Sequence, residues 1–498
     1  MTTVADLKGQ TVAFAASGGL DSCTVTKWLT DHGVKVVCVT ADIAQPDETD
    51  FGAIERRMRA CGAADYVAVP LHDMIAESGV EVIQFQARYE GAYWNTTGIG
   101  RHVIVAGLVP ELRKRGITVL GHGATGRGND QVRFQLCTNM LAPDVTVYAP
   151  WRDQAFLSRF RGRTEMIEYC EGHKLPITAS KTAPYSTDAN LLGLTHEAGK
   201  LEHLDCPPWF VTPGMGVLPK DAPDAPETVT IRFEQGRPVA VNGKPTTAFE
   251  AIRQTNAIGG KHAVGICTHL VENRFVGIKS RGVYEAPGME VVGTAYAYLL
   301  QLILDRRARE MYDHLSGYVA KQIYQGYGFD LGTHLARQAV APINALATGT
   351  IGLTLYKGRA EFASAADVPH QLYSEANASM EAIGAFDHAD SEGFLRVLQY
   401  LEREYNAPAS ERDAWIRHWI EEGFGAFEAL LVEDLSRGEF CEGETPGLAD
   451  CCLIPQVYNA RRFGVNLDPY PNILRIEAAC LALPAFDAAR PENQPDAA

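Results

Sequence analysis

The chain has 498 residues, of which 46% are hydrophobic and 21% are charged, so it can bury sizeable cores and is expected to form about three domains. Its formal net charge of −16 argues against a nucleic-acid partner, because phosphate backbones are bound by clustered Lys and Arg. The first twenty residues contain Asp6, Lys8 and only a short apolar run, which fits neither a secretory signal nor a membrane span. We therefore expect a cytoplasmic protein without a membrane partner.

Residues 17–22, SGGLDS, lie between an apolar run at 11–16 and a helical pattern at 23–32. Two adjacent glycines allow backbone N–H groups to turn toward a bound oxyanion, and the hydroxyls of Ser17 and Ser22 add donors. The start of the following helix contributes partial positive charge. The segment therefore predicts a phosphate-binding loop, and the alternative is an ordinary glycine turn between a strand and a helix.

This loop lacks the lysine of a kinase-type P-loop, which would contact the β and γ phosphates. A phosphate loop without that lysine suits chemistry at the α phosphate, with pyrophosphate as the leaving group. Asp21 is a candidate carboxylate for Mg²⁺, which usually takes one or two carboxylates together with phosphate oxygens. The eleven cysteines include no C-x-x-C pair, so we expect reduced, mostly buried thiols and no metal held by the protein alone.

Three regions follow one another along the chain. Residues 1–175 alternate β-rich runs with amphipathic segments, which predicts a doubly wound parallel sheet of the pyrophosphate-loop ATPase type. Residues 176–393 predict an α+β synthetase domain. Period-two runs at 229–233 and 239–241 flank a turn and predict a hairpin, and a second β-rich piece at 351–362 has a turn at residues 357–358. Residues 394–498 show only helical periodicity and predict a separate all-α module. The β-rich runs of the first region are at 11–16, 34–40, 66–69, 117–120 and 146–149.

A second glycine cluster, GHGATGRGND at residues 121–130, follows the predicted strand at 117–120. Its G-x-G-x-x-G spacing matches a dinucleotide fingerprint only weakly, because the first strand–helix unit already carries a phosphate loop. A helix starting here brings Asn129, Asp130 and Arg133 onto one edge. Such a trio suits a small zwitterion, with Arg133 facing a carboxylate and Asp130 an ammonium; the alternative is a capped helix start with a surface arginine.

Two further polar segments occur at residues 185–197 and 271–285. Their spacing alone favours solvated loops over binding segments.

Taken together, eight ordered blocks resemble argininosuccinate synthases over residues 1 to about 390. Their sequences are most similar to the bacterial branch of that family. The blocks are AASGGLDS, TADIAQPDE, YWNTTGIGR, GHGATGRGNDQVRF, YSTDANLLGLTHEAGKLE, TIRFEQGRPVAVNGK, GGKHAVG and VENRFVGIKSRGVYEAPG. The resemblance implies an enzyme that uses ATP and Mg²⁺ to join citrulline to aspartate through a citrullyl-AMP intermediate. It also implies a homo-oligomer, specifically a tetramer.

The resemblance assigns roles to residues at matching positions. It implies an ATP site formed by Ala15, Ala16, Ser17, Gly18, Gly19, Leu20, Asp21, Ser22, Cys23, Ala41, Gly123, Thr125, Asp130 and Asp188. It implies an aspartate site formed by Thr125, Asn129 and Asp130, and a citrulline site formed by Tyr93, Asn129, Arg133, Ser186, Thr195, Glu197, Glu272 and Tyr284. Catalysis by positioning and electrostatic stabilisation is expected to depend on Asp21, Asp130 and Arg133.

The helical end resembles the C-terminal half of zeta-class glutathione S-transferases of the maleylacetoacetate isomerase type, from residue 395 to about 498. The blocks are LRVLQYL, DAWIRHWIEEGF and FCEGETPGLADCCLIPQVYNARRFGVNLDPYPNI. The thioredoxin-like half with its Ser-Ser-Cys glutathione site has no counterpart in the chain. We therefore expect a module that associates without binding glutathione productively. The alternatives are a glutathione-dependent isomerase or transferase, and a ligase fold that binds its ligands with little turnover.

Overall fold

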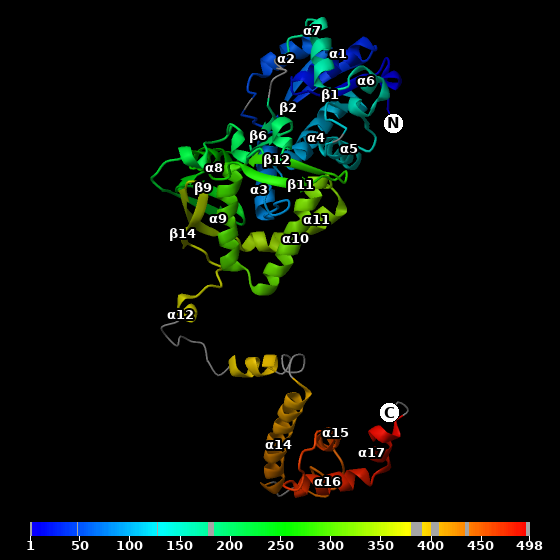
Figure 1. Cartoon of the computed structure of the whole chain (residues 1–498), viewed down its shortest axis with the longest axis vertical. Helices are drawn as coiled ribbons and strands as arrows, with labels where there is room; N and C mark the ends of the chain where they lie inside the picture. Colours follow the sequence, from blue (N-terminus) through cyan, green and yellow to red (C-terminus); the bar gives the residue numbers. More distant parts are fainter. Residues whose placement is uncertain are drawn as a thin grey trace. The chain divides into compact units, whose positions relative to one another are not determined.

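The computed structural model describes residues 2–46, 48–126, 128–177, 184–379, 391–399, 408–433 and 438–494. The chain forms two compact units, residues 1–374 and 375–498 (Figure 1). The boundary predicted near residue 175 falls inside the first unit and stays a prediction.

The first unit begins with a five-stranded parallel sheet in the order β3-β2-β1-β4-β5. Its strands are β1 Thr11–Ala15, β2 Lys35–Asp42, β3 Asp65–Pro70, β4 Val119–His122 and β5 Thr146–Tyr148. The strand order reverses between β1 and β4, and ligands of such sheets bind at the carboxyl ends beside this point. The predicted doubly wound sheet is therefore confirmed.

Helices cover both faces of this sheet because consecutive strand residues point to opposite sides. Val12 and Phe14 pack toward α1 Leu20–Asp31, α2 Phe51–Ala60 and α7 Arg163–Gly172. Ala13 packs toward α4 Thr96–Arg115 and α5 Asp130–Leu141 on the other face. Two further helices of this region are α3 His72–Gln84 and α6 Gln154–Arg159.

The rest of the first unit contains two antiparallel sheets. The larger has the order β10-β9-β8-β13-β14, with β8 Glu227–Glu234, β9 Arg237–Val241, β10 Lys244–Pro245, β13 Gly349–Tyr356 and β14 Arg359–Ala366. The β-rich runs predicted at 229–241 and 351–362 each form an antiparallel hairpin in this sheet. Both turn residues between β13 and β14, Lys357 and Gly358, have positive φ (44° and 92°), as two-residue hairpin turns require. Four helices pack with these sheets, α8 Ala248–Lys261, α9 Pro287–Ile303, α10 Arg306–Gln325 and α11 Leu331–Leu346.

The smaller sheet corrects the loop interpretation of residues 185–197 and 271–285. These segments form strands, in the order β11-β12-β7-β6, with bounds β6 Ser186–Asn190, β7 Gly193–Glu197, β11 Thr268–Asn273 and β12 Lys279–Glu285. Thr195 pairs with Tyr284 and Glu197 with Gly282. Because alternate residues share a face, Thr195 and Glu197 point to one side while His196 packs on the other. Polar side chains are frequent here because one face of the sheet lines a cavity.

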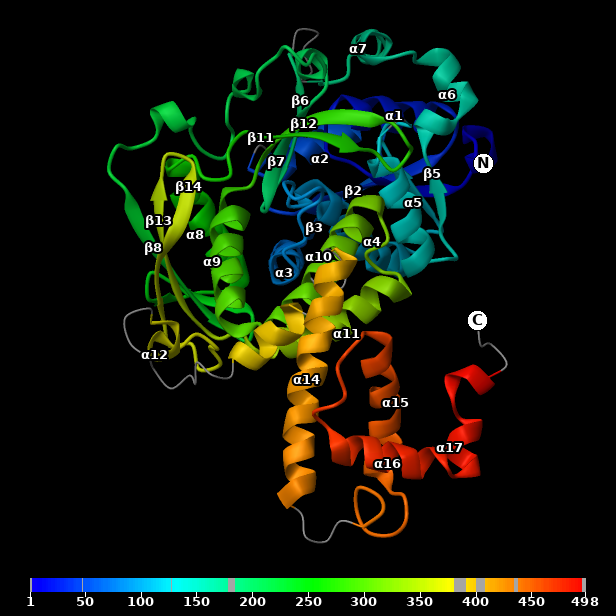
Figure 2. The same ribbon diagram turned by 60° about the horizontal axis from the view of Figure 1, so that its bottom comes forward.

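The second unit contains α12 Glu375–Ala378, α14 Ala409–Glu433, α15 Leu448–Arg462, α16 Pro471–Leu481 and α17 Pro484–Ala488 (Figure 2). It has its own core, in which Phe424 of α14 packs with Val457 of α15 and with Ile473 and Ile476 of α16. After residue 366 the described part of the chain contains helices and turns but no strand. The predicted all-α character is therefore confirmed for these residues.

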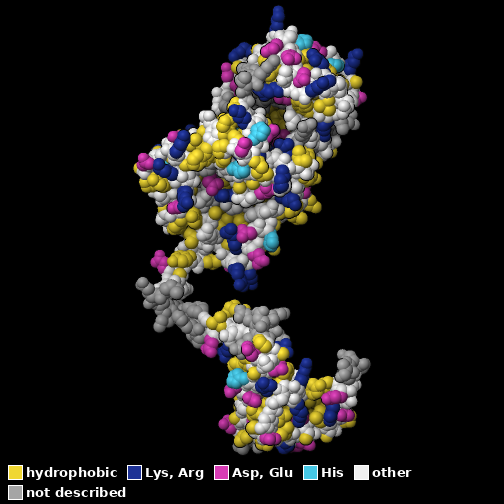
Figure 3. Space-filling view, viewed as in Figure 1, with side chains coloured by type: hydrophobic (Ala, Val, Ile, Leu, Met, Phe, Trp, Pro, Cys, Tyr) yellow, Lys and Arg dark blue, Asp and Glu magenta, His cyan; other side chains and the backbone are white. Residues whose placement is uncertain are grey.

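Basic and acidic side chains are interspersed over the face of the first unit that Figure 3 presents. Most of the eleven cysteines are buried, while Cys451 and Cys452 are exposed. Among the described residues, no helix combines the length and the apolar character needed to cross a bilayer.

Candidate active site

The glycine loop after β1 has the geometry of an anion-binding turn. The backbone N–H of Ser17 donates to Oγ of Ser22 at 3.0 Å, which closes the turn against the first helical turn of α1. Gly18 has φ 79°, a conformation that a side chain disfavours. A Cβ at Gly18 would approach Ile54 Cγ2 to 3.0 Å and Arg57 Nη2 to 3.1 Å. The loop is therefore built for glycine by backbone conformation and by space.

The loop opens into a cavity of about 430 Å³, here called the loop cavity. Eleven residues of the predicted ATP set line it, Ala15, Ala16, Ser17, Gly18, Gly19, Asp21, Ser22, Ala41, Gly123, Asp130 and Asp188. Leu20 and Cys23 do not line it, because both side chains are buried in the core below α1. The wall also contains Arg57, which forms an ion pair with Glu48 at 2.8 Å. Neither of these two residues was predicted as part of the site.

Asp21 lies at the inner wall of the loop cavity. Its Oδ1 accepts a hydrogen bond from Nε1 of Trp151 at 3.2 Å, and burial raises the pKa of its carboxyl. The described residues contain no cluster of three or more His, Cys, Asp or Glu side chains placed to hold a metal. This donor set fits a Mg²⁺ ion that is coordinated mainly by phosphate oxygens and by a single protein carboxylate.

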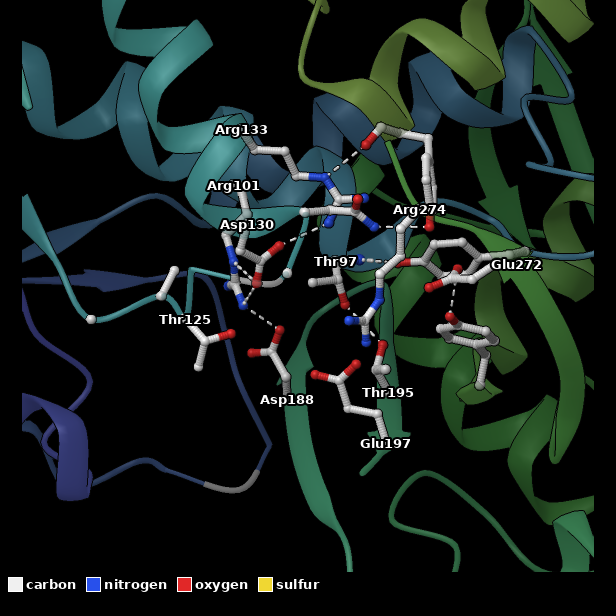
Figure 4. A pocket seen from close by; sticks show the side chains of 17 residues that line it. Thr97, Arg101, Thr125, Asp130, Arg133, Asp188, Thr195, Glu197, Glu272 and Arg274 are labelled. Carbon is white, nitrogen blue, oxygen red and sulfur yellow. Dashed lines mark hydrogen bonds and ion pairs between the residues drawn. The ribbon is translucent and has the colours of Figure 1, made fainter. Parts of the chain in front are cut away.

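A second cavity of about 250 Å³, the polar cavity, adjoins the first (Figure 4). It brings together predicted residues from five separate segments, namely Tyr93, Gly123, Thr125, Asn129, Asp130, Arg133, Asp188, Thr195, Glu197, Glu272 and Tyr284. Ser186 lines neither cavity and is exposed at the start of β6. Five residues line both cavities and form a shared wall, Arg101, Gly123, Ala124, Asp130 and Asp188.

A network of ion pairs crosses the shared wall. Arg101 of α4 donates Nε to Asp130 at 3.0 Å and Nη2 to Asp188. Arg133, one turn into α5, donates Nη1 to Asp130 at 2.8 Å and Nε to the carbonyl of Tyr324 at 2.9 Å. Burial alone would raise the pKa of Asp130, but the two guanidinium groups outweigh it and hold the pKa at about 2. Asp130 is therefore an anion that orients two cations.

One end of the polar cavity is formed by β7, β11 and β12 of the small antiparallel sheet, whose β6 carries Asp188 of the shared wall. Glu272 of β11 accepts from Tyr284 Oη at 2.9 Å and from Ser280 Oγ at 2.9 Å. Thr195 and Thr97 share a hydrogen bond of 2.8 Å between their hydroxyls. Figure 4 shows Glu197 and Thr195 pointing into the cavity from β7. Carboxylates and hydroxyls are thus concentrated at this end, as an ammonium group requires.

Glu197 has an unusual protonation equilibrium. Although Glu197 keeps solvent access at the end of β7, desolvation by the cavity wall and the nearby charges of Asp130 and Asp188 raise the pKa of its carboxyl to about 7. Arg274 acts in the opposite direction and lies beside Glu197 in Figure 4. Glu197 therefore changes charge within the range in which most enzymes are assayed.

Sequence reasoning missed six residues that line the polar cavity, Ala124 and Gly128 of the glycine cluster and Thr97, Arg101, Arg274 and Tyr324, whose side chains are polar. Arg101 lies in the block YWNTTGIGR and Arg274 in the block VENRFVGIKSRGVYEAPG, so both were within motifs whose other members were predicted. Tyr324, near the end of α10, belongs to no motif. Its hydroxyl accepts from Nδ2 of Asn129 at 2.8 Å, a contact between segments that are distant in the chain.

The two joined cavities suit an enzyme that activates one small molecule with a nucleotide and transfers it to another. The phosphate loop without a lysine suits the activation step, in which the nucleotide is bound. The polar cavity, which is lined by charges of both signs, suits the transfer step. The fold and the site define an ATP-dependent ligase.

Comparison with known proteins identifies the family. Residues 11–176 match the "Arginosuccinate synthase N-terminal HUP domain", and residues 185–405 match the "Arginosuccinate synthase C-terminal domain". The argininosuccinate synthase of Rhodopirellula baltica is 43% identical over 385 residues, covering 77% of this chain and 95% of that protein. That of Erythrobacter litoralis is 38% identical and covers 78% and 95%. The chain belongs to the argininosuccinate synthase family.

Among solved structures, zeta-class glutathione S-transferases match part of the chain, as predicted. A zeta-class maleyl pyruvate isomerase is 50% identical, covers 21% of this chain and 49% of its own, and has a TM-score of 0.19. A maleylacetoacetate isomerase from Anaeromyxobacter dehalogenans is 31% identical, covers 30% and 76%, and has a TM-score of 0.18. The chain spans about half the length of the first of these isomerases.

Proposed function

We propose that this chain is a cytoplasmic argininosuccinate synthase that joins citrulline and aspartate at the expense of ATP. The observation that carries the proposal is the wall shared by the two cavities. An α phosphate held from the loop cavity and a ureido group held in the polar cavity would meet at Arg101, Asp130 and Asp188. Reaction at that wall needs positioning and charge stabilisation rather than a protein nucleophile.

The reaction consists of two displacement steps, which release pyrophosphate and then AMP. The ureido oxygen of citrulline attacks the α phosphorus, and the bond to the β phosphate breaks, releasing pyrophosphate. The amine of aspartate then attacks the ureido carbon of citrullyl-AMP, loses a proton, and displaces AMP together with the former ureido oxygen. Arg101 is the cation of the shared wall, where negative charge develops on the α phosphate, and Arg133 contacts Asp130 of that wall from the polar cavity.

Each ligand has a proposed set of contacts. The loop residues 15–19, 21 and 22, with Ala41, Gly123 and Asp188, would bind ATP. Thr125, Asn129 and Asp130 would bind aspartate, and Asp130 would also lie near ATP. Citrulline would be bound by Tyr93, Asn129, Arg133, Thr195, Glu197, Glu272 and Tyr284. Mg²⁺, held by the phosphates and by Asp21, would neutralise charge on the leaving pyrophosphate.

The proposal is tested by product stoichiometry. The purified chain, given ATP, citrulline and aspartate, is expected to form argininosuccinate, AMP and pyrophosphate in equal amounts. Omitting citrulline should abolish the release of pyrophosphate. Release that continues at the same rate without citrulline would overturn the assignment.

The protonation of Glu197 predicts a pH dependence. The Glu197 carboxylate can pair with the citrulline ammonium only when it is deprotonated, and its pKa is about 7. We therefore expect kcat/KM for citrulline to fall as the pH is lowered through that value, while kcat/KM for ATP falls less. In Glu197→Gln this acid limb should disappear, and kcat/KM at pH 8 should be lower by about 10- to 100-fold. An unchanged acid limb in the variant would refute the assignment of Glu197.

We expect the ligase activity not to require the helical module, which can be tested by truncating the chain. A chain ending after Ser374 keeps every residue that lines either cavity. We expect it to retain citrulline-dependent pyrophosphate release within about tenfold of the full chain, because a compact domain with its own core can fold alone. We also propose that the full chain is a homotetramer, which sedimentation velocity of both forms would test. Loss of activity on truncation would show that the module is required for turnover, and binding of glutathione by the full chain would favour the transferase alternative.

A further inference from the structure

We infer that Arg57 is the phosphate-binding cation that the glycine loop itself lacks, and that it binds the two terminal phosphates of ATP, which leave as pyrophosphate. This inference rests on the proposed function and deepens it, because Arg57 belongs to none of the sequence blocks and to none of the contacts assigned to ATP above. It concerns the side of the loop cavity that α2 forms.

The charges that line the loop cavity are unevenly placed. Two guanidinium groups are part of its described lining, those of Arg57 and Arg101. Arg101 pairs with Asp130 and Asp188 at the shared wall, the place proposed for the α phosphate. The β and γ phosphates carry most of the charge of ATP and lie beyond that wall. Arg57 lines the loop cavity but not the polar cavity, so it is the cation placed to meet them.

Arg57 lies against the glycine turn of the phosphate loop. A Cβ at Gly18 would come within 3.1 Å of Nη2 of Arg57 and 3.0 Å of Cγ2 of Ile54. Ile54 and Arg57 are three residues apart in α2, so their side chains lie on the same face of that helix. Ile54 is fully buried beneath the turn, while Arg57 contributes to the cavity wall. The guanidinium group is therefore within reach of an oxyanion bound by residues 17–19.

The Arg57 side chain is held in place without using all of its donors. Its Nη2 donates to Oε2 of Glu48 at 2.8 Å, and the side chain is only 14% exposed. Its Nε is buried and has no hydrogen-bond partner among the residues that the structure describes. A guanidinium group carries five N–H donors, so it can bind phosphate oxygens while it keeps the contact with Glu48. A buried donor without a partner costs free energy, which favours a ligand that brings acceptors.

The alternative role for Arg57 is to fasten the segment around Glu48 to α2. Glu48 is one third exposed, and an ion pair with such a partner adds little stability. Both members of the pair also line the loop cavity, where a triphosphate would be bound. The two roles differ in their consequences. Loss of a fastening contact would weaken every ligand of the cavity alike, whereas loss of a phosphate contact would weaken only ligands that carry the terminal phosphates.

The test compares two ligands and three variants. Magnesium pyrophosphate carries the two phosphates assigned to Arg57, and AMP carries the α phosphate alone. The variants are Arg57→Gln, Arg57→Lys and the control Arg56→Gln, which removes the neighbouring arginine of α2, whose side chain is 74% exposed and outside both cavities. Isothermal titration calorimetry of the full chain gives Kd for each ligand without turnover, and steady-state pyrophosphate release gives KM for ATP.

For Arg57→Gln we expect Kd for pyrophosphate and KM for ATP to rise about 10- to 100-fold, because charge-assisted contacts are lost. Kd for AMP should change by less than about threefold. Arg57→Lys should recover part of the loss, because lysine keeps the charge but not the planar set of donors. Arg56→Gln should behave as the parent chain.

Equal losses for pyrophosphate and AMP would overturn the inference, since Arg57 would then act only on the shape of the loop. Unchanged binding of pyrophosphate by Arg57→Gln would overturn it as well. A denaturant unfolding curve for each variant identifies misfolding, and if Arg57→Gln does not fold, the same comparison is made with Arg57→Lys. Pyrophosphate release by the parent chain without citrulline would instead refute the proposed function, so the two failures are distinguishable.

Discussion

Asp130→Asn is expected to lower citrulline-dependent pyrophosphate release by about 10³-fold, the largest single effect that we predict. The substitution keeps the size of the side chain but leaves Arg133 without its anionic partner and leaves Arg101 with Asp188 alone. Breaking a buried ion pair typically costs about 3–5 kcal/mol, because the remaining charge loses its partner. Misplacing two cations at the reacting phosphate then lowers kcat as well as substrate binding. The measurement is the steady-state rate of pyrophosphate release at saturating ATP.

Asp144→Asn is the matched control, since Asp144 is exposed in the loop between α5 and β5. It should leave both activity and stability unchanged. Activity of Asp130→Asn within about tenfold of the parent chain would contradict the role of the network.

We also expect Asp130→Asn to change how the stability of the protein depends on pH. The pKa of Asp130 is lowered from 3.8 to about 2, so its stabilising contribution is complete above pH 3.8 and is lost as the pH falls through about 2. From the size of that shift, the contribution is about 2 kcal/mol. The difference in unfolding free energy between the parent chain and Asp130→Asn should therefore shrink over this acid range.

Gly18→Ala is expected to raise the KM for ATP by about 100-fold and to lower the free energy of unfolding by about 1–3 kcal/mol. The positive φ of Gly18 is unfavourable for alanine, and the new Cβ would meet Ile54 and Arg57. Relief of either conflict moves the backbone of residues 17–19, which line the loop cavity. ATP titrations and denaturant unfolding measure the two effects.

Gly19→Ala provides the comparison within the same loop. Gly19 has φ −78°, and a Cβ there would meet Oγ of Ser17 at an ordinary 3.6 Å. Its unfolding free energy should stay within about 0.5 kcal/mol of the parent value. If Gly18→Ala and Gly19→Ala lower stability equally, the positive φ of Gly18 is not the cause.

The parallel sheet and the phosphate loop could be predicted because their signals are local. The apolar run at residues 11–16 and the adjacent glycines at 18 and 19 specify a strand, a turn and a helix start without distant contacts. The strands β6, β7, β11 and β12 could not be predicted in this way, because the face of their sheet that lines the polar cavity is polar. In the sequence, the pattern of polar residues is then the same for a strand that lines a cavity as for a solvated loop.

The missing members of the site depend on contacts between distant segments. Arg101 gains its position from Asp130 and Asp188, which lie 29 and 87 residues away in the chain. Tyr324 meets Asn129 across 195 residues. Leu20 was assigned to the ATP site because it lies within the loop motif, yet the first turn of α1 directs it into the core. A motif therefore predicts which segment contributes to a site, while tertiary packing decides which of its side chains enter.

In the proposed reaction, the ureido oxygen of citrulline attacks the α phosphate at the wall between the two cavities. It is tested most directly with citrulline labelled with ¹⁸O in the ureido group, supplied with ATP and aspartate. We expect one ¹⁸O atom in each AMP released and no AMP when citrulline is omitted. Unlabelled AMP, formed at the same rate as argininosuccinate, would contradict it.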